Sequence, residues 1–439
     1  INTPDLIDIY KLTINPENNS QYLFDNIWKD FEVFDSEISV KILKLFNMEF
    51  SKEIKWSIHG PVLELKHGTY AIRYSGMNEI RQIEQWFRMN KASTFSEWEE
   101  AVKLGYLPSL NCMYADKEGN IFYLYNASFP KRDSKFNWKD YIPGDTSESL
   151  WTDFEGYKAL PKILNPKSGF LQNCNSTPFK TTDGDDNPIA SNFPKELGIE
   201  KYMTNRALRA LEMFGNDSKI SKDDIFKYKY DMKYSEKSAI AQYRNDILKA
   251  NFSTKNPIIK EALKILKDWD LNTDPDNEGA ALAILSTKPY LKDYYEKISE
   301  SELVDHFVDA AQFLKDKYGE IDVAWGDVNR MIRGNLNLSL GGGPDIMHSI
   351  YGKLKRNGEL EAFAGDSYIL FIKWDHEGNV SSNSVHQYGS ATGREKSPHF
   401  SDQSLLFANR KLKSVWFEKK DIVDNMENRY KPGESGYAK

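Results

Sequence analysis

Cysteine is scarce in this chain, whose 439 residues include two, Cys112 and Cys174. Two cysteines exclude a disulfide-rich scaffold and any zinc site built on cysteine ligands, and they leave open whether the two thiols pair. Long apolar runs are also missing. The richest run, Ala280 to Leu285, has charged flanks and is far shorter than the about 20 apolar residues that a membrane span requires. We therefore expect no membrane span.

An excess of basic residues is absent as well. The chain has 58 Lys and Arg against 65 Asp and Glu, a net charge of −7. A nucleic-acid-binding protein would show a basic patch or stripe, so no such partner is expected. The 24 Phe, 24 Tyr and 10 Trp exclude a disordered chain. Low cysteine use with many Asn and Tyr is compatible with export, and we expect a periplasmic or secreted location.

The motifs of several common enzyme classes are missing. The chain has no G-x-S-x-G nucleophile elbow, no H-E-x-x-H, no P-loop and no G-x-G-x-x-G before a helix. Its seven histidines do not pair at metal-ligand spacing. A conventional Ser-His-Asp hydrolase, a zinc protease and a nucleotide-dependent enzyme all lose support. A glycoside hydrolase would need a pair of catalytic carboxylates, which we do not find.

Three regions differ in pattern. Residues 1–195 alternate as strands with long loops, including a hairpin that turns at Asp116 to Gly119. Residues 196–339 carry apolar residues at i, i+3 and i+4, which predicts successive helices. Residues 340–439 open with a glycine run and return to strand patterns. The order predicts an α+β core with an inserted helical region, whose sheet is completed by the C-terminal strands.

A short asparagine motif is the first candidate site. Phe170 to Gln172 is predicted as a strand, so Asn173 and Asn175 would point to the same side. A side-chain amide at a strand end is a suitable fixed donor to an oxyanion, where one donor is worth about 3 kcal/mol in the transition state. The alternative is that both amides cap a loop, and the residues by themselves favour that alternative.

Several segments in chain order resemble motifs of the penicillin acylase family of N-terminal nucleophile hydrolases. Any one alone would be weak, but together they span nearly the whole chain. Within the family, the sequence resembles most the N-acyl-homoserine-lactone and aculeacin acylase branch. The segments are Trp56–Val62 (WSIHGPV), Asn111–Ile121 (NCMYADKEGNI), Asn165–Pro178 (NPKSGFLQNCNSTP), Leu340–Asp345 (LGGGPD), and Gly389-Ser390 followed by Ser397–Gln403 (SPHFSDQ).

The resemblance implies a fold and an activity. The fold is a four-layer αββα core with antiparallel sheets. The activity is hydrolysis of the amide bond of N-acyl compounds, an acyl-homoserine lactone or a related acyl amide, through an acyl-enzyme on an N-terminal Ser whose own α-amine is the base. No cofactor is required for this chemistry. The alternatives are a penicillin- or cephalosporin-type acylase and, from another class, a non-catalytic extracellular ligand-binding module.

The resemblance also assigns roles to individual residues. Asn175 donates its side-chain amide to the oxyanion, and Asn173 is structural. Arg206 orients Asn175, with Arg209, one turn later, as the competing residue. Ile1 falls at the position that donates a backbone NH to the same oxyanion.

The family motif that matches the start of this chain lies after the nucleophile. Asn2 to Tyr10 resembles the segment that follows the backbone-NH donor, and Ile1 has no hydroxyl. The resemblance therefore implies a β-subunit fragment that contains no nucleophile and is inactive alone. Its expected partner is an α subunit from the same precursor.

A calcium site is implied for some members of the family. Asp5, the backbone carbonyl of Ile7 and Asp8 match its spacing, and Asp186 is a further candidate carboxylate. Carboxylates and carbonyls are the ligands that calcium prefers. The alternative is a capped turn without a metal ion.

Two histidines are interpreted as structural. His59 lies in a strand before Gly60-Pro61, where a buried core histidine is more common than a catalytic base. His399 and Asp402 are expected to hydrogen-bond to each other and to hold the returning chain.

Overall fold

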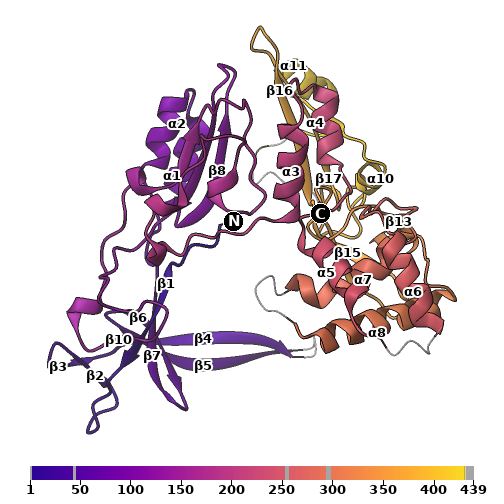
Figure 1. Ribbon diagram of the computed structural model, residues 1–439. Coiled ribbons are helices and arrows are strands. Elements are labelled where there is room, and N and C mark those ends of the chain that lie inside the picture. The colour runs from indigo at the N-terminus through magenta and orange to yellow at the C-terminus, as the bar shows by residue number, and fades with distance from the viewer. Residues whose placement is uncertain (1, 43–45, 253–256, 293–297, 430, 432–439) are drawn as a thin grey trace. The chain divides into compact units, whose positions relative to one another are not determined.

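The computed structural model describes residues 2–42, 46–252, 257–292, 298–429 and 431 (Figure 1). The chain forms two compact units, Ile1–Tyr202 and Met203–Lys439. The domain boundaries predicted at residues 195 and 339 stay a prediction. Within the described ranges, no helix is both long enough and apolar enough to cross a membrane.

The first unit contains a six-stranded sheet with the order β10-β1-β7-β6-β5-β4. Neighbouring strands are antiparallel except β1 and β10, which are parallel. In β1 the side chains of Asp8, Tyr10 and Leu12 alternate inward and are buried. The strand therefore buries a carboxylate in line with two core residues. The bounds are β1 Ile7–Leu12, β4 Glu32–Ile42, β5 Phe46–Ser57, β6 Gly60–Leu65, β7 Gly68–Tyr74 and β10 Ile142–Pro143.

Strands β4 and β5 extend from this sheet as a long two-stranded ribbon (Figure 1). Directly opposite residues share a face in an antiparallel pair. One face of the ribbon is apolar, with the pairs Phe34–Ile54, Ile38–Phe50 and Val40–Met48, whereas the other carries polar and charged residues such as Asp35 and Glu53. Phe34, Ile38, Val40, Met48 and Phe50 are all exposed. A separate hairpin joins β2 (Gln21–Phe24) and β3 (Ile27–Asp30).

A second, three-stranded antiparallel sheet has the order β11-β9-β8. Its strands are β8 (Ser109–Ala115), β9 (Ile121–Ala127) and β11 (Lys162–Leu164). The predicted hairpin turn at Asp116 to Gly119 is confirmed, since the Asp116 amide donates to the Asn120 carbonyl at 3.1 Å. Helices α1 (Gln82–Lys91) and α2 (Phe95–Val102) contribute Met89, Trp98 and Val102 to the core that they share with β9.

Most of the chain between β9 and the second unit is irregular. It contains β10, β11 and five 3₁₀ turns, at Ser147–Ser149, Tyr157–Ala159, Pro178–Lys180, Ala190–Asn192 and Lys195–Leu197. Long ordered loops of this kind often carry function in compact proteins. Both asparagines of the candidate motif lie in this segment.

The second unit begins with the helices that the periodicity predicts. Ser or Thr caps four of them: Thr204, Ser221, Ser238 and Ser299 each accept a hydrogen bond from the third residue of their helix. The apolar faces of the helices from Ala239 to Val328 form one core around Tyr243, Leu282, Phe307 and Trp325. The helices are α3 Asn205–Gly215, α4 Lys222–Lys229, α5 Ala239–Lys249, α6 Pro257–Asp268, α7 Ala280–Lys292, α8 Glu300–Tyr318 and α9 Trp325–Val328.

The strands after the helices form two further sheets. The first has the order β13-β12-β15-β14, with β12 (Asn329–Arg333) parallel to β15 (Leu360–Gly365) and antiparallel to β13 (Leu336–Ser339), and β14 (Ile350–Leu354) antiparallel to β15. The second is antiparallel, with the order β16-β17-β18. These strands span Tyr368–Trp374, Val380–His386 and Lys413–Val415, and the last two helices are α10 (Ser404–Ala408) and α11 (Lys419–Asn425). An α+β protein rich in antiparallel sheets is confirmed.

His59 is fully buried beneath the six-stranded sheet's core residue Tyr10, with the two rings stacked at 4.1 Å between centroids. Its Nε2 lies 3.0 Å from the carbonyl oxygen of Gly144. Because a carbonyl oxygen can only accept, Nε2 must be the donor, so the neutral His59 ring carries its proton on Nε2. The pKa of His59 is lowered to about 4, chiefly by burial; the Gly144 carbonyl acts against this shift and the positive charge of Arg73 adds to it.

This low pKa predicts an acid-sensitive fold. The unfolded chain binds a proton at His59 below about pH 6.5 and the folded chain does so near pH 4, so the free energy of unfolding falls as the pH drops between these values. At pH 5 the expected loss relative to pH 7.5 is about 2 kcal/mol. His59→Gln retains a donor for Gly144 but does not titrate, so its denaturant midpoint should fall less over this range. Equal pH slopes in both proteins would contradict the prediction.

Candidate functional site

Asn175 lies on a turn and not at a strand end. The predicted strand Phe170–Gln172 is wrong, because this stretch has no strand partner and Asn175 has a left-handed backbone, with φ of +58°. Asparagine tolerates this conformation better than most residues. The Asn173 side-chain oxygen accepts a hydrogen bond from the Asn175 amide at 3.2 Å, which closes a local turn. The two asparagines therefore do not share a face through strand alternation.

The loop around Asn175 is pinned on both sides. Gln172 binds the carbonyls of Thr181 and Lys180 through its backbone amide and its side chain, both at 2.8 Å. The Thr177 amide donates to the Tyr202 carbonyl at 3.0 Å, and the Thr177 hydroxyl caps the following 3₁₀ turn. Asn175 itself is half-buried. Such a loop can hold one side-chain amide in a fixed place.

The side chain of Asn173 connects the turn around Asn175 to the neighbouring sheet. Its Nδ2 lies 3.5 Å from the hydroxyl of Tyr123, and that hydroxyl donates to Oδ1 of Asn111 at 2.7 Å. Asn111 and Tyr123 belong to the paired strands β8 and β9. The chain of contacts ties the turn to the sheet, which is consistent with a structural role for Asn173.

Cys112 and Cys174 both remain thiols, and burial raises the pKa of Cys112 to about 12.

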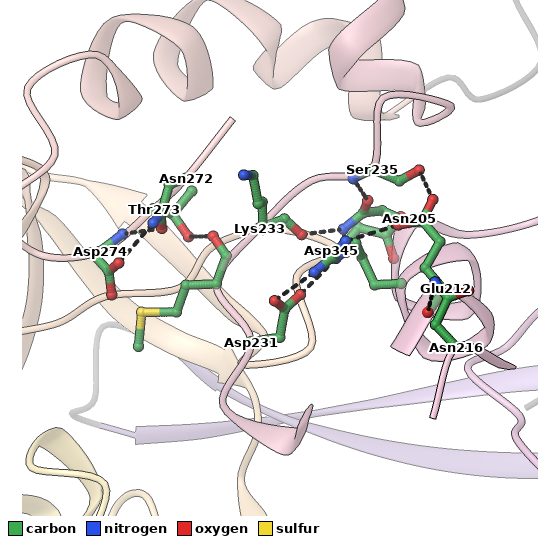
Figure 2. A network of polar contacts seen from close by, with 12 residues as sticks. Asn205, Glu212, Asn216, Asp231, Lys233, Ser235, Asn272, Thr273, Asp274 and Asp345 are labelled. Carbon is green, nitrogen blue, oxygen red and sulfur yellow. Dashed lines mark hydrogen bonds and ion pairs between the residues drawn. The ribbon is translucent and has the colours of Figure 1, made fainter. Parts of the chain in front are cut away.

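Arg206 lies in the first turn of α3 in the second unit. Its Nε pairs with Oδ1 of Asp345 at 3.1 Å, while Oδ2 of Asp345 accepts from the Asn205 amide at 2.6 Å. Figure 2 shows Asp345 facing Asn205, whose Nδ2 donates in turn to the Asp345 carbonyl at 2.8 Å. Asp345 thereby fixes both the start of the helix and the guanidinium of Arg206.

The glycine run before Asp345 has a steric reason. Gly342 has φ of +78°, and a Cβ there would lie 2.1 Å from the carbonyl oxygen of His348. Only glycine fits so close an approach at that conformation. Asp345 also has a positive φ, of 56°. The run predicted as a glycine-rich return therefore bends the chain so that a carboxylate meets the start of α3.

Arg209, the competing residue, is fully engaged elsewhere. Its Nε and Nη2 form a bidentate ion pair with the two carboxylate oxygens of Asp231, both at 2.8 Å. Its Nη1 donates to Oε2 of Glu212, also at 2.8 Å. The hydrogen bonds to Asp231 raise the pKa of Arg209. Glu212 accepts a further hydrogen bond from Ser235 at 2.6 Å (Figure 2). These contacts are consistent with a structural role for Arg209; which of the two arginines orients Asn175 stays a prediction, with Arg206 as the predicted residue.

The structure brings Asp5 and Asp8 together, but around an arginine. Arg132 Nη2 lies 3.0 Å from Oδ2 of Asp8 and 3.2 Å from Oδ1 of Asp5. Asp186 instead accepts a hydrogen bond from the Lys167 amide at 2.7 Å. In the part of the chain that the structure describes, no three His, Cys, Asp or Glu side chains form a group that could hold a metal ion. With Arg132 in place, these residues do not fit a calcium ion.

Three partners were not foreseen from the sequence: Arg132, Trp151 and Asp345. Trp151 Nε1 donates to Oδ2 of Asp8 at 2.7 Å. Burial raises the pKa of Asp8, and Arg132 and Trp151 act against that rise. A buried carboxylate requires a positive or donating partner. The inward-facing position of Asp8 in its strand was therefore the sequence signal from which such a partner could have been predicted.

Ile1 lies outside the described residues, and its predicted role stays a prediction. The expected contact of His399 with Asp402 is confirmed at 3.1 Å.

Comparison with known proteins agrees with these motifs. Penicillin G acylase of Escherichia coli is 27% identical over 181 residues, covering 40% of this chain and 21% of that protein. The acyl-homoserine lactone acylase PvdQ of Pseudomonas fluorescens (strain Pf0-1) is 20% identical, covering 95% of this chain and 61% of that protein. The chain thus spans less than two thirds of the length of these curated relatives.

A solved structure supports the fold. The thermostable penicillin G acylase from Alcaligenes faecalis superposes with a TM-score of 0.66 at 18% identity, covering 97% of this chain and 86% of the other. The predicted fold class is thereby confirmed. A family model described as penicillin amidase matches residues 1–424. The chain belongs to the penicillin amidase family.

Proposed function

We propose that this chain forms part of an enzyme that hydrolyses the amide bond of N-acyl compounds, with an acyl-homoserine lactone or a related acyl amide as substrate. The observation that carries the proposal is Asn175, a half-buried side-chain amide in a loop that is held by contacts of Gln172 and Thr177. Family membership and the alignment with an acyl-homoserine lactone acylase over 95% of the chain support it.

The proposed reaction has two halves. A serine hydroxyl attacks the acyl carbon and its proton passes to the serine's own α-amine; the C–N bond then breaks and the protonated amine leaves. Water next attacks the ester, and the acid is released. Asn175 Nδ2 donates to the oxyanion in both tetrahedral intermediates. We propose that the serine lies outside residues 1–439 and that Arg206 is the positioning residue for Asn175.

The proposed protein partner follows from the family resemblance, and the proposed location from the low cysteine use with many Asn and Tyr. We propose an α subunit from the same precursor as the protein partner, and a periplasmic or secreted location. Cell fractionation of the natural host, with antibodies against this chain, tests both proposals. The chain should be recovered in the periplasmic or secreted fraction, together with a second polypeptide. Recovery in the cytoplasm would contradict the location.

The direct test is amine release by the full-length natural protein. Acyl-homoserine lactones of several chain lengths and penicillin G are the substrates, and a fluorogenic amine reagent gives the readout. We expect turnover of about 1 s⁻¹ or more on the best acyl-homoserine lactone. A preference for penicillin G would favour the penicillin-type alternative. Tight binding without amine release from any substrate would favour the non-catalytic binding module.

A further inference from the structure

The ion cluster around Asp8 is among the most deeply buried in the first unit. The side chain of Asp8 is 0% exposed and that of Arg132 is 3% exposed. A buried carboxylate without a cation or several donors is strongly unfavourable. Asp5 adds a second negative charge, with 33% of its side chain exposed. The cluster therefore requires a positive charge at its centre.

Arg132 meets that requirement with contacts in several directions. Its Nε and Nη2 lie 3.1 and 3.0 Å from Oδ2 of Asp8, and Nη2 also reaches Asp5. Its Nη1 donates to the carbonyl of Glu196 at 3.3 Å, and its guanidinium lies 5.5 Å from the ring centre of Trp138. A planar guanidinium suits such a set of acceptors better than a point charge does.

The chain around the cluster is fitted closely to it. The Asp5 amide donates to the Leu197 carbonyl at 3.4 Å. Gly198, with φ of +61°, lies so near that a Cβ there would be 2.6 Å from Cβ of Asp5. Arg132 thus joins three segments of the first unit: the residues before and in β1, the loop after β9, and the 3₁₀ turn at Lys195–Leu197.

We propose that Arg132 takes the place of a structural divalent cation in this chain and makes the first unit independent of calcium. Calcium binds oxygen ligands at 2.3–2.6 Å, so it would need the space between the two carboxylates that the guanidinium fills. A calcium ion and the Arg132 guanidinium cannot occupy this space together, and as two cations in close proximity they would also repel each other. Oδ1 of Asp8 is buried and has no hydrogen-bond partner among the described residues, and this oxygen becomes available to a cation once the guanidinium is removed.

The test compares melting temperatures of the full-length natural protein with and without calcium. The wild-type protein should be unaffected by a chelator and by about 5 mM calcium, a level above the Kd of typical weak sites. Arg132→Met keeps much of the side-chain volume and removes the charge. We expect it to melt at a lower temperature and to gain about 3 °C or more on adding calcium, by mass action. Magnesium should do less, since it demands octahedral geometry.

Two further variants make the result specific. Arg132→Met with Asp8→Asn removes the buried negative charge, so it should melt above Arg132→Met and ignore calcium. Arg73→Met removes a nearby guanidinium that donates to the carbonyls of Trp151, Ile58 and His59. It should melt lower without any response to calcium, because both carboxylates keep Arg132.

Each alternative outcome contradicts the proposal. A wild-type protein that loses stability with the chelator and regains it with calcium would show that the metal ion binds beside Arg132. An Arg132→Met protein without a calcium response would show that the guanidinium is not equivalent to a divalent cation. If Arg132→Met fails to fold, the double variant decides: restored folding supports the proposal, and a double variant that also fails to fold contradicts it.

Discussion

Replacing Asn175 by alanine is expected to lower kcat of the full-length natural protein about 10²–10³-fold and to leave KM nearly unchanged. The amide is a neutral donor to a neutral carbonyl in the ground state, and its hydrogen bond strengthens when the oxygen becomes an anion. The loss corresponds to about 2.7–4 kcal/mol of transition-state stabilisation. Amine release under saturating substrate gives kcat directly.

The controls separate the lost donor from a disturbed backbone. Asn175 has φ of +58°, a conformation that costs alanine about 1 kcal/mol. Asn175→Gly removes that cost, and Asn175→Asp keeps the shape while removing the donor. Asn175→Gly should lose as much kcat as Asn175→Ala, and Asn175→Asp at least as much, because its carboxylate also repels the oxyanion. Normal kcat in Asn175→Gly would show that another group stabilises the oxyanion.

Replacing Asp345 by alanine is expected to destabilise the second unit by about 2–3 kcal/mol. The change leaves the Arg206 guanidinium and the Asn205 amide without the carboxylate that binds both. Fully buried pairs lose more when one partner is removed; here the Arg206 side chain is 23% exposed, so water recovers part of the cost. Urea unfolding measures the loss.

The same variant tests which arginine positions the oxyanion donor. If Arg206 orients Asn175, Asp345→Ala should also lower kcat about tenfold or more, with little change in KM. Asp231→Ala is the matched control, because it removes the main partner of Arg209. It should destabilise the unit by a similar amount and leave kcat close to that of the wild type. A larger kcat loss in Asp231→Ala would transfer the role to Arg209.

Local patterns in the sequence predicted the helices well. The segments of α3 to α8 combine apolar spacing with Ser or Thr caps at most of their starts, and both signals are local. The strand at Phe170–Gln172 failed because its short apolar run is equally compatible with a loop, and the left-handed backbone of Asn175 leaves little trace in the sequence. The catalytic role of Asn175 was predicted from the ordered family motifs, because the local residues favoured a loop cap.

The ion clusters were out of reach for a different reason. Arg132 is 124 residues from Asp8, and Arg206 is 139 residues from Asp345. Pairings across such distances depend on the fold and leave no periodic signal. The family resemblance did predict that Asp5 and Asp8 lie together, because their spacing matches a motif that binds a cation, and both carboxylates contact Arg132. It did not indicate that the cation would be a side chain of the same unit.

The ribbon of β4 and β5 has a consequence for motion. Among the described residues, beyond the short pairing of Trp56 and Ser57 with β6, the ladder hydrogen bonds of the ribbon join its two strands to each other. A two-stranded hairpin alone is marginally stable in water, so we expect it to open without the rest of the unit. Amide hydrogen exchange followed by mass spectrometry should show fast deuterium uptake at Glu37–Ile42 and slow uptake in β1 and β7. One continuous sheet would then contain two separately opening parts, with the boundary near Trp56.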